Sequence, residues 1–453
     1  MSAKDVGYSR LRANLFWGLI ASGLFLGVQR ADAQLAEMDN SLQARPPAVT
    51  PIYHMPRPYY EPARIELGSF LLAPAVTEML AGDDNIFATG ERRAGDVIFT
   101  TSEDATLQSQ WRSDSALLRL DHAYQSYLSH ATENANTYGS QGDFRFAVSD
   151  SAWVEFQAAF AQQPQERNSA QADRLSLKRP IYNTIPVAAS YGQDWNRWHN
   201  VLTAGMTQIA YISQAEAQRS AMKWRYRDRL SYALTADTWS FLQVSYSTQN
   251  WLLNPGRRNF NTLNATAGVN FQIADMIDGE LGAGVLRQAY RFSGFADLVT
   301  PTFGGHLNWN ILPLTSLLVS GERTVTGLET FCDAGNILAN PVCAALSGTT
   351  LSTLGNQLGA LELTEAEIGL QHEFWHDLLG EIRFRYERDQ FDPLDLVDKN
   401  YSVNVGSRFL INRNLELDLS YALNIRTANK NILLYNSGRY QANMATLALK
   451  AAL

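Results

Sequence analysis

Short turns marked by Asp or Asn recur along this chain and separate stretches in which apolar and polar residues alternate. The steps between successive markers are 36, 44, 43, 38, 35, 67 and 35 residues. Most steps can therefore hold two strands of roughly ten to fifteen residues with one short turn and one longer loop, which is typical of a transmembrane β-barrel of the bacterial outer membrane. The markers are Asp114, Asp150, Asp194, Asp237, Asp275, Asn310, Asp377 and Asn412.

Two segments show the strand pattern most clearly. From Leu263 to Ile273 the odd positions are apolar and, apart from Gly268, the even positions are polar. The segment from Leu415 to Arg426 alternates in nearly the same way. Alternation of this length is hard to produce in a helix. We expect an all-β antiparallel barrel of about eighteen strands, or about sixteen if the weaker segments 180–192 and 239–250 are not strands, with short periplasmic turns and long extracellular loops.

The N-terminus has the features of a secretory signal peptide. Its apolar stretch, 15–28, is shorter than the ~20 residues that a membrane-spanning helix needs. It follows a basic lead (Lys4, Arg10, Arg12) and precedes the small-x-small sequence Ala31-Asp32-Ala33. We therefore predict a signal peptide at 1–33 with cleavage near Ala33, a periplasmic tail at 34–64, and an outer-membrane barrel at 65–453.

The predicted tail is rich in proline, which removes backbone donors and favours extended, unpaired chain. It is too short to be the plug domain of an active-uptake receptor. Two interpretations stay open, a simple tether and a docking segment for a periplasmic partner. The prolines are Pro46, Pro47, Pro51, Pro56, Pro58 and Pro62.

Composition agrees with one continuous barrel domain. Charged residues make up 18% of the chain, below the roughly 25% of soluble proteins. A barrel gives this composition because every second residue of a strand faces lipid. The net charge of −8 and the pI of about 5.5 give no support for nucleic-acid binding.

Most of the tryptophans lie near the predicted short turns. Interfacial girdles place Trp and Tyr at the level of the lipid headgroups. We therefore predict that these residues form a girdle at the periplasmic end. They are Trp111, Trp153, Trp195, Trp198, Trp239, Trp309 and Trp375.

Both ends of the predicted barrel resemble the family described as putative β-barrel porin 2. The similar stretches are Leu67-Gly68-Ser69-Phe70-Leu71-Leu72-Ala73-Pro74, Asp83-Asp84-Asn85-Ile86-Phe87, Tyr386-Glu387-Arg388-Asp389, Asn412-Arg413-Asn414-Leu415 and Tyr421. The resemblance implies an outer-membrane barrel of a Gram-negative bacterium, in a family often encoded with exopolysaccharide or capsule machinery. It implies periplasmic polysaccharide-export partners and supplies no catalytic residues. One departure is the C-terminus, which ends at Leu453 and not at an aromatic residue.

One enzyme-like motif occurs, His372-Glu373-Phe374-Trp375-His376, which matches the zinc-binding pattern H-E-x-x-H. That pattern binds zinc from a helix, where the two imidazoles lie one turn apart. Here it continues an alternating run, and on a strand residues four apart are separated by about 13 Å. We therefore expect no metal, no cofactor and no enzymatic activity.

Cys332 and Cys343, the only two cysteines, lie in the longest predicted outer loop, about 327–358. A closely spaced pair in a secreted protein predicts a disulfide. The closed loop could resist proteolysis, or it could fold inward and narrow the pore.

Charges on the predicted inner face are the candidate functional site. Four cations in a row repel one another unless acidic neighbours or an anionic solute lie against them. They could belong to a cross-strand network, or form a wall that attracts an anionic saccharide. The row is Lys223, Arg225, Arg227 and Arg229, opposite Trp224, Tyr226, Leu230 and Tyr232; Glu365, Glu367, Glu373, Glu381, Arg383, Arg385 and Glu387 line other strands.

Three functions remain open on these grounds. The first, which depends on the resemblance, is an outer-membrane conduit for export of an exopolysaccharide or related glycan. The second is a general diffusion porin for small solutes. The third is a receptor or scaffold with a filled lumen. In each case the expected surroundings are outer-membrane lipid.

Overall fold

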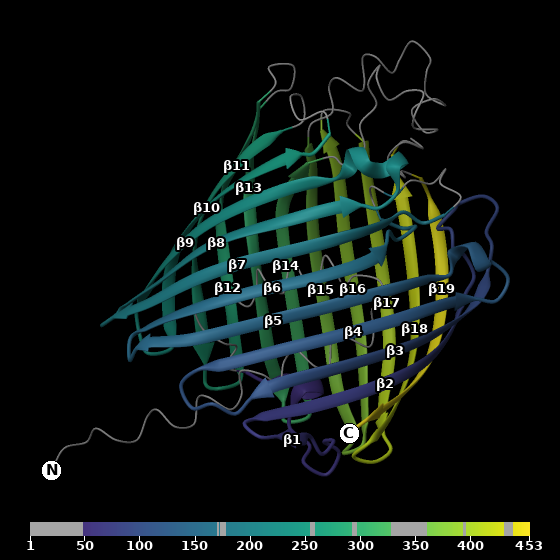
Figure 1. The fold of residues 1–453 in the computed structure, drawn as a ribbon, viewed down its shortest axis with the longest axis horizontal. Coiled ribbons are helices and arrows are strands. Elements are labelled where there is room, and N and C mark those ends of the chain that lie inside the picture. The colour runs from purple at the N-terminus through teal and green to yellow at the C-terminus, as the bar shows by residue number, and fades with distance from the viewer. Residues whose placement is uncertain are drawn as a thin grey trace.

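The computed structural model describes residues 49–169, 172, 178–253, 259–291, 297–327, 360–392, 396–429 and 438–453. Their strands form one antiparallel sheet that closes on itself, because β2 pairs with both β3 and β19 (Figure 1). The sheet has nineteen strands. Eighteen of these, β2 to β19, make the ring, which confirms the predicted barrel and its strand number, and the short β1 (Ile65–Leu67) pairs only with the start of β2.

The weak segments at 180–192 and 239–250 are both strands, β7 and β10. The ring consists of β2 (Phe70–Asp83), β3 (Asp96–Ser109), β4 (Ser115–Tyr127), β5 (Ala135–Ser149), β6 (Ala152–Pro164), β7 (Ile181–Trp195), β8 (Trp198–Tyr211), β9 (Ala221–Ala233), β10 (Thr238–Trp251), β11 (Phe260–Ile273), β12 (Ile277–Tyr290), β13 (Leu298–Leu312), β14 (Thr315–Gly327), β15 (Ala360–Trp375), β16 (Leu378–Asp392), β17 (Leu396–Leu410), β18 (Leu415–Ala428) and β19 (Tyr440–Ala452).

Connections between strands differ at the two ends of the barrel. At the short-turn end two to five residues join β3 to β4, β5 to β6 and so on to β17 and β18. Two marker residues belong to strands and not to turns, because Asp194 and Asn310 precede the turns at 196–197 and 313–314. The turn after β11 places Ala274 and Asp275 at φ of 50° and 55°, a left-handed geometry that suits the twist of hairpins. The other end has the longer connections, with η2 (Ala131–Glu133) and η3 (Gln214–Arg219) among them.

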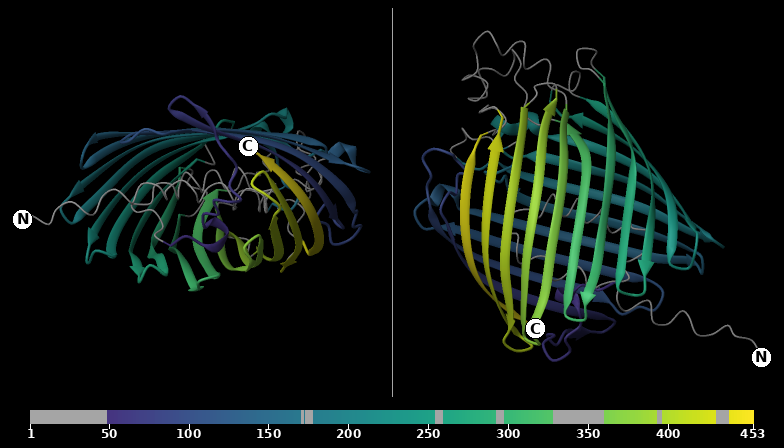
Figure 2. Two further views of the ribbon diagram at one scale, coloured as in Figure 1. Left: turned by 90° about the horizontal axis from the view of Figure 1, so that it is seen from below. Right: turned by 180° about the vertical axis from the view of Figure 1, so that it is seen from behind.

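The strands are tilted, so that those on opposite walls of the ring cross in projection. In Figure 1, β3 to β8 run almost horizontally across the view, whereas β14 to β19 run almost vertically. Seen from below in Figure 2, the ring is wider than it is deep. Glycine permits the close approach of β11 and β12, since a Cβ at Gly284 would lie 1.9 Å from the carbonyl oxygen of Ala265.

Alternation assigns the two faces of the strands. The outer face carries exposed apolar side chains, which include Leu242, Val285, Ile368, Leu419 and Leu447. The residues between them face the lumen, and many of these are charged or amide side chains. This pattern is the one expected of a membrane barrel with a wet interior. Among the described residues, no helix is both long and apolar enough to cross a membrane.

The N-terminal part of the described chain does not extend away from the barrel. After residue 49 it forms η1 (Ile52–His54) and then reaches β1. Figure 2 shows this purple segment inside the ring of strands when the barrel is seen from below. The predicted signal peptide and its cleavage site lie outside the described residues.

Candidate functional site: the inner wall

Ion pairs join neighbouring strands on the inner face of β15 and β16. Arg385 lies 2.7 Å from Glu365 and 3.4 Å from Glu387. Arg383 lies 2.6 Å from Glu381 and 3.4 Å from Glu367. Each guanidinium therefore contacts one carboxylate on its own strand and one on the next, as expected for residues whose side chains share a face.

The same network continues onto β17 and β18. The side-chain amide of Asn400 donates to Glu387 at 2.9 Å and to Asp389 at 3.1 Å. Its Oδ1 atom accepts a hydrogen bond from Arg426 at 2.6 Å. Arg408, lower on the wall, lies 2.9 Å from Glu416 and 3.1 Å from Asp418. The inner wall from β15 to β18 thus presents guanidinium, carboxylate and amide groups that are largely paired with one another.

The predicted basic row lies on β9, opposite the exposed side chains of Trp224, Tyr226 and Leu230. Arg229 forms a bidentate pair with Glu280 of β12, at 3.0 and 2.8 Å. Its guanidinium also lies 3.9 Å from the ring centroid of Phe241. Lys223, Arg225 and Arg227 have partners within the protein as well. Their role as a wall for an anionic solute remains a prediction.

At the long-loop end, the connection between β6 and β7 reaches across the barrel. The backbone carbonyl of Asn168 accepts a hydrogen bond from Arg426 of β18. On the near side, Gln165 accepts a hydrogen bond from Arg219 at 2.9 Å, and Arg167 lies 2.7 Å from Glu133. The described residues of this connection are therefore fixed to three separate parts of the chain.

Glu133 holds the near side of that connection. It is buried between Arg167 and Arg179, and Arg179 also donates to its backbone carbonyl at 2.6 Å. Burial raises the pKa of the neighbouring Glu166 to about 7, opposed by the charge of Arg179. Two acidic residues, Glu133 and Glu166, and two basic ones, Arg167 and Arg179, thus make one ionic cluster at this mouth.

At the short-turn end, part of the predicted tail occupies the lumen. Ile52 donates its backbone N–H to Ser316 at 2.9 Å, and Tyr53 donates its own to Gln371 at 3.3 Å. Arg57 forms an ion pair with Glu373 at 2.8 Å. Residues 50–57 of the predicted tail are therefore held against the inner wall, which supplies partners for some of their backbone groups.

The predicted tryptophan girdle must be corrected for two residues. Trp153 and Trp239 face the lumen, since they share strand parity with the inner residues Glu155 and Phe241, and the Arg145 guanidinium lies 4.0 Å from the Trp153 ring centroid. The reason is that nearness to a turn does not determine the face of a strand. The side chains of Trp111, Trp195, Trp198 and Trp375 are exposed at the short-turn end, and Trp309 shares parity with exposed Phe303.

The H-E-x-x-H residues do not converge. The Nδ1 atom of His372 and the hydroxyl of Thr315 share a hydrogen bond of 2.9 Å. Glu373 instead forms an ion pair with Arg57 and lies 3.3 Å from His376. Across the part of the chain that the structure describes, no group of three or more His, Cys, Asp or Glu side chains could hold a metal. Cys332 and Cys343 lie outside the described residues, so their disulfide stays a prediction.

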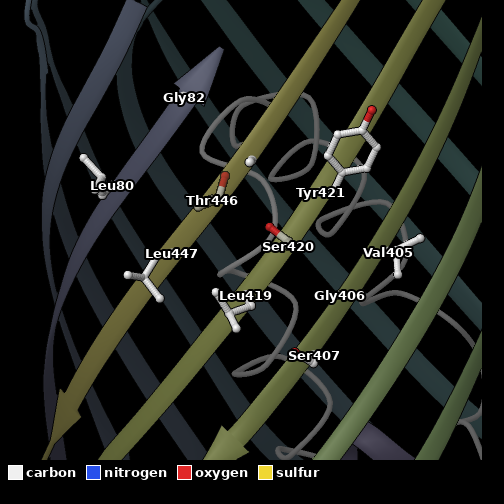
Figure 3. Close-up of a pocket in the computed structure, with 11 residues that line it drawn as sticks. Leu80, Gly82, Val405, Gly406, Ser407, Leu419, Ser420, Tyr421, Thr446 and Leu447 are labelled. Atoms are coloured by element: carbon white, nitrogen blue, oxygen red, sulfur yellow. The ribbon is translucent and has the colours of Figure 1, made fainter.

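A shallow pocket of about 550 Å³ lies on the outer face, over β17, β18, β19 and β2 (Figure 3). Exposed side chains of Leu80, Val405, Leu419 and Leu447 surround it. Gly82 and Ala445 also line it, and their small size leaves the space between the larger side chains unfilled. Because it opens on the lipid-facing surface, it is not part of the lumen.

The sequence indicated the charges of β9, β15 and β16 but not the residues at the two mouths. Arg426, Glu133 and Arg57 gave no periodic signal that distinguished them.

A closed antiparallel ring with an apolar outer face and a charged inner face defines an outer-membrane β-barrel of the channel type. The chain belongs to the family described as putative beta-barrel porin 2, whose model matches residues 57–340 and 342–451. The curated proteins that were compared with this chain contain no match to it.

Solved barrels have a similar fold at low sequence identity. OpdK from Pseudomonas aeruginosa, crystallised with vanillate, is 8% identical, with a TM-score of 0.44, over 84% of this chain and 98% of that one. OccK2 (OpdF) from the same organism, in complex with glucuronate, is 11% identical, with a TM-score of 0.45, over 85% and 99%. The siderophore receptor PirA from Acinetobacter baumannii is 9% identical, with a TM-score of 0.41, over 84% and 80%.

Proposed function

We propose that this porin is a passive outer-membrane channel for a hydrophilic glycan, and that it acts in the export of an exopolysaccharide or a related glycan. Barrels of this strand number commonly enclose an aqueous channel. The family match gives the class of protein, and the chemistry of the inner wall supports the kind of cargo.

The observation that carries the proposal is the paired network on β15 to β18. Arg383 and Arg385 each contact carboxylates on two strands, and Asn400 links Glu387 to Arg426. Such a wall offers many donors and acceptors to sugar hydroxyls. Because its charges are largely paired, it presents no strong field of one sign that would retain one kind of ion.

General diffusion of small solutes is the second candidate, because the same wall would also admit small polar molecules. The loop connection fixed to Arg426 and the N-terminal segment both lie within the lumen and favour small cargo over a polymer. The two candidates therefore differ in the largest sugar that passes.

Liposome swelling with the full-length protein tests this proposal. We expect swelling with neutral mono- and oligosaccharides, and stepwise ion conductance in planar bilayers. In the native host, deletion of the gene should lower surface exopolysaccharide and leave polymer in the periplasm, while a strain that produces the protein again should recover. Swelling together with normal surface polymer would support general diffusion. The N-terminal segment could block the lumen, so the same assays should be repeated with variants in which this segment no longer binds the wall. If neither swelling nor conductance occurs in any of these proteins, the protein is a scaffold and not a channel.

A further inference from the structure

The inner wall at the short-turn end contacts the N-terminal segment around the short helix η1. The backbone carbonyl of Thr50 accepts from Asn310 at 3.1 Å, and the backbone N–H groups of Ile52 and Tyr53 bind Ser316 and Gln371. These three wall residues come from β13, β14 and β15. Within the segment, the backbone N–H groups of His54 and Met55 donate to the carbonyls of Pro51 and Ile52. The wall supplies partners for backbone groups that these two bonds leave over.

The wall also changes from polar to apolar where the segment lies. Leu379 is at an inner-face position of β16, two residues before Glu381 and four before Arg383. It is 1% exposed because Ile52 and Tyr53 pack on it. Without the segment, this leucine would face the wet lumen next to a charged network, which is unfavourable for an apolar side chain.

Arg57 shapes the segment and attaches it to the wall. Its Nη1 donates to the backbone carbonyls of Ile52 and Met55, each at 3.0 Å. Its Nη2 donates to Glu373 at 2.8 Å. The guanidinium of Arg408 from β17 lies 5.0 Å from the ring centroid of Tyr53. One arginine of the segment and one of the wall therefore close the site from opposite sides.

We propose that this part of the inner wall is a binding site for residues 49–57, and that this segment is a plug which closes the short-turn mouth of the channel. The inference goes beyond the proposed function, because it adds a closed state that transport must relieve. The site consists of Asn310, Ser316, Gln371, Glu373, Leu379 and Arg408.

The contacts are too few to hold the plug permanently. Three hydrogen bonds to the backbone, one ion pair, the contact of Arg408 with the Tyr53 ring and one small apolar cluster fix about nine residues. Ordering these residues costs conformational entropy, and each neutral hydrogen bond contributes little net free energy. The plug therefore exchanges between a bound and a released state, and single substitutions in the site should shift that equilibrium.

Tyr53 of the plug and Tyr59, two residues beyond its end, provide a matched test. Tyr53 is 7% exposed in the site, whereas Tyr59 is 83% exposed. We expect Tyr53→Ala to increase the ratio of open to closed time in planar bilayers by about tenfold, which corresponds to about 1.4 kcal/mol. Tyr59→Ala should behave as the wild type. Equal open times in all three proteins would overturn the proposal.

Charge reversal tests the ion pair independently. Arg57→Glu should open the channel because it places two carboxylates together, and the double variant Arg57→Glu with Glu373→Arg should recover part of the closed time. The recovery is partial because position 57 can no longer donate to the backbone carbonyls of Ile52 and Met55. A purely structural role for Glu373 in the barrel would give no such recovery. Heat-modifiable migration on gels checks that each variant has folded into a barrel.

A reversible cross-link tests the plug without relying on a substitution that weakens its binding. In a background with Cys332→Ser and Cys343→Ser, the pair Ile52→Cys and Ser316→Cys should be joined by a short thiol cross-linker that contains a reducible disulfide, because the backbone nitrogen of Ile52 lies 2.9 Å from the Ser316 hydroxyl and the two chain segments are therefore close. The cross-linked channel should stay closed and open after reduction. Conductance that is the same before and after reduction refutes the plug, whereas no conductance in any variant refutes the channel function itself.

Discussion

At the scale of single residues, a few buried charged groups determine where the irregular segments of this protein lie. Glu133 holds Arg167 and Arg179 at the long-loop end, and Glu373 holds Arg57 at the other. Loss of one partner from such a pair leaves a charge that is both buried and unpaired. The positions of the loop and the plug therefore depend on individual side chains more than the strands do.

His54 makes the plug sensitive to pH. Burial lowers its pKa, and the charge of Arg408 lowers it further, with Arg383 acting in the same direction and Glu381 in the opposite one. A lowered pKa means that the bound plug favours neutral imidazole. The resulting stabilisation is present above the ordinary pKa of 6.5 and is lost as the pH falls through the lowered value.

We therefore expect acidification from about pH 7.5 to about pH 5, the range in which histidine changes charge, to increase the open time of the wild-type channel. In His54→Gln this increase should be smaller, because position 54 can no longer gain a proton. Single-channel recordings of both proteins over the same pH range measure the difference. Identical profiles would show that other groups control any pH response.

At the scale of elements, the strands could be predicted from sequence and the segments inside the lumen could not. A period of two residues is a local signal, so segments such as 263–273 and 415–426 define their own strands. The plug depends on partners far away in the chain, since Ile52 and Ser316 are 264 positions apart and Tyr53 and Gln371 are 318 apart. The same holds for Arg426 and Asn168, which are 258 apart. Local patterns contain no information about such contacts.

The basic row of β9 is the element whose effect on transport is easiest to test. We propose that it biases the lumen toward anions, since fixed charges set the selectivity of pores. Replacing Lys223, Arg225, Arg227 and Arg229 by Gln should shift the reversal potential toward cations, and Glu280 would lose its bidentate partner, which acts in the same direction. Arg287→Gln, at an exposed site on the other face of its strand, is the control. An unchanged potential would show that internal partners neutralise the row.

At the scale of the whole molecule, ring closure joins the two ends of the barrel sequence. β19 pairs with β2 from Met444 opposite Asp83 to Ala452 opposite Ala75. Both β1 and the end of β19 then lie at the short-turn end, beside the plug. The wall residues that the described N-terminal segment contacts, such as Ser316, Gln371 and Glu373, therefore lie at the end that we predict to face the periplasm.

This orientation predicts which residues an impermeant thiol reagent can reach in intact cells. In a background with Cys332→Ser and Cys343→Ser, Asp237→Cys and Arg413→Cys at short turns should stay unreactive, because the outer membrane separates them from the reagent. Leu128→Cys and Leu253→Cys, exposed on long connections at the other end, should react. Cells opened by osmotic shock should label all four, which controls for buried thiols. The reverse pattern in intact cells would place the plug on the outer surface, and the channel would then be closed from outside and not from the periplasm.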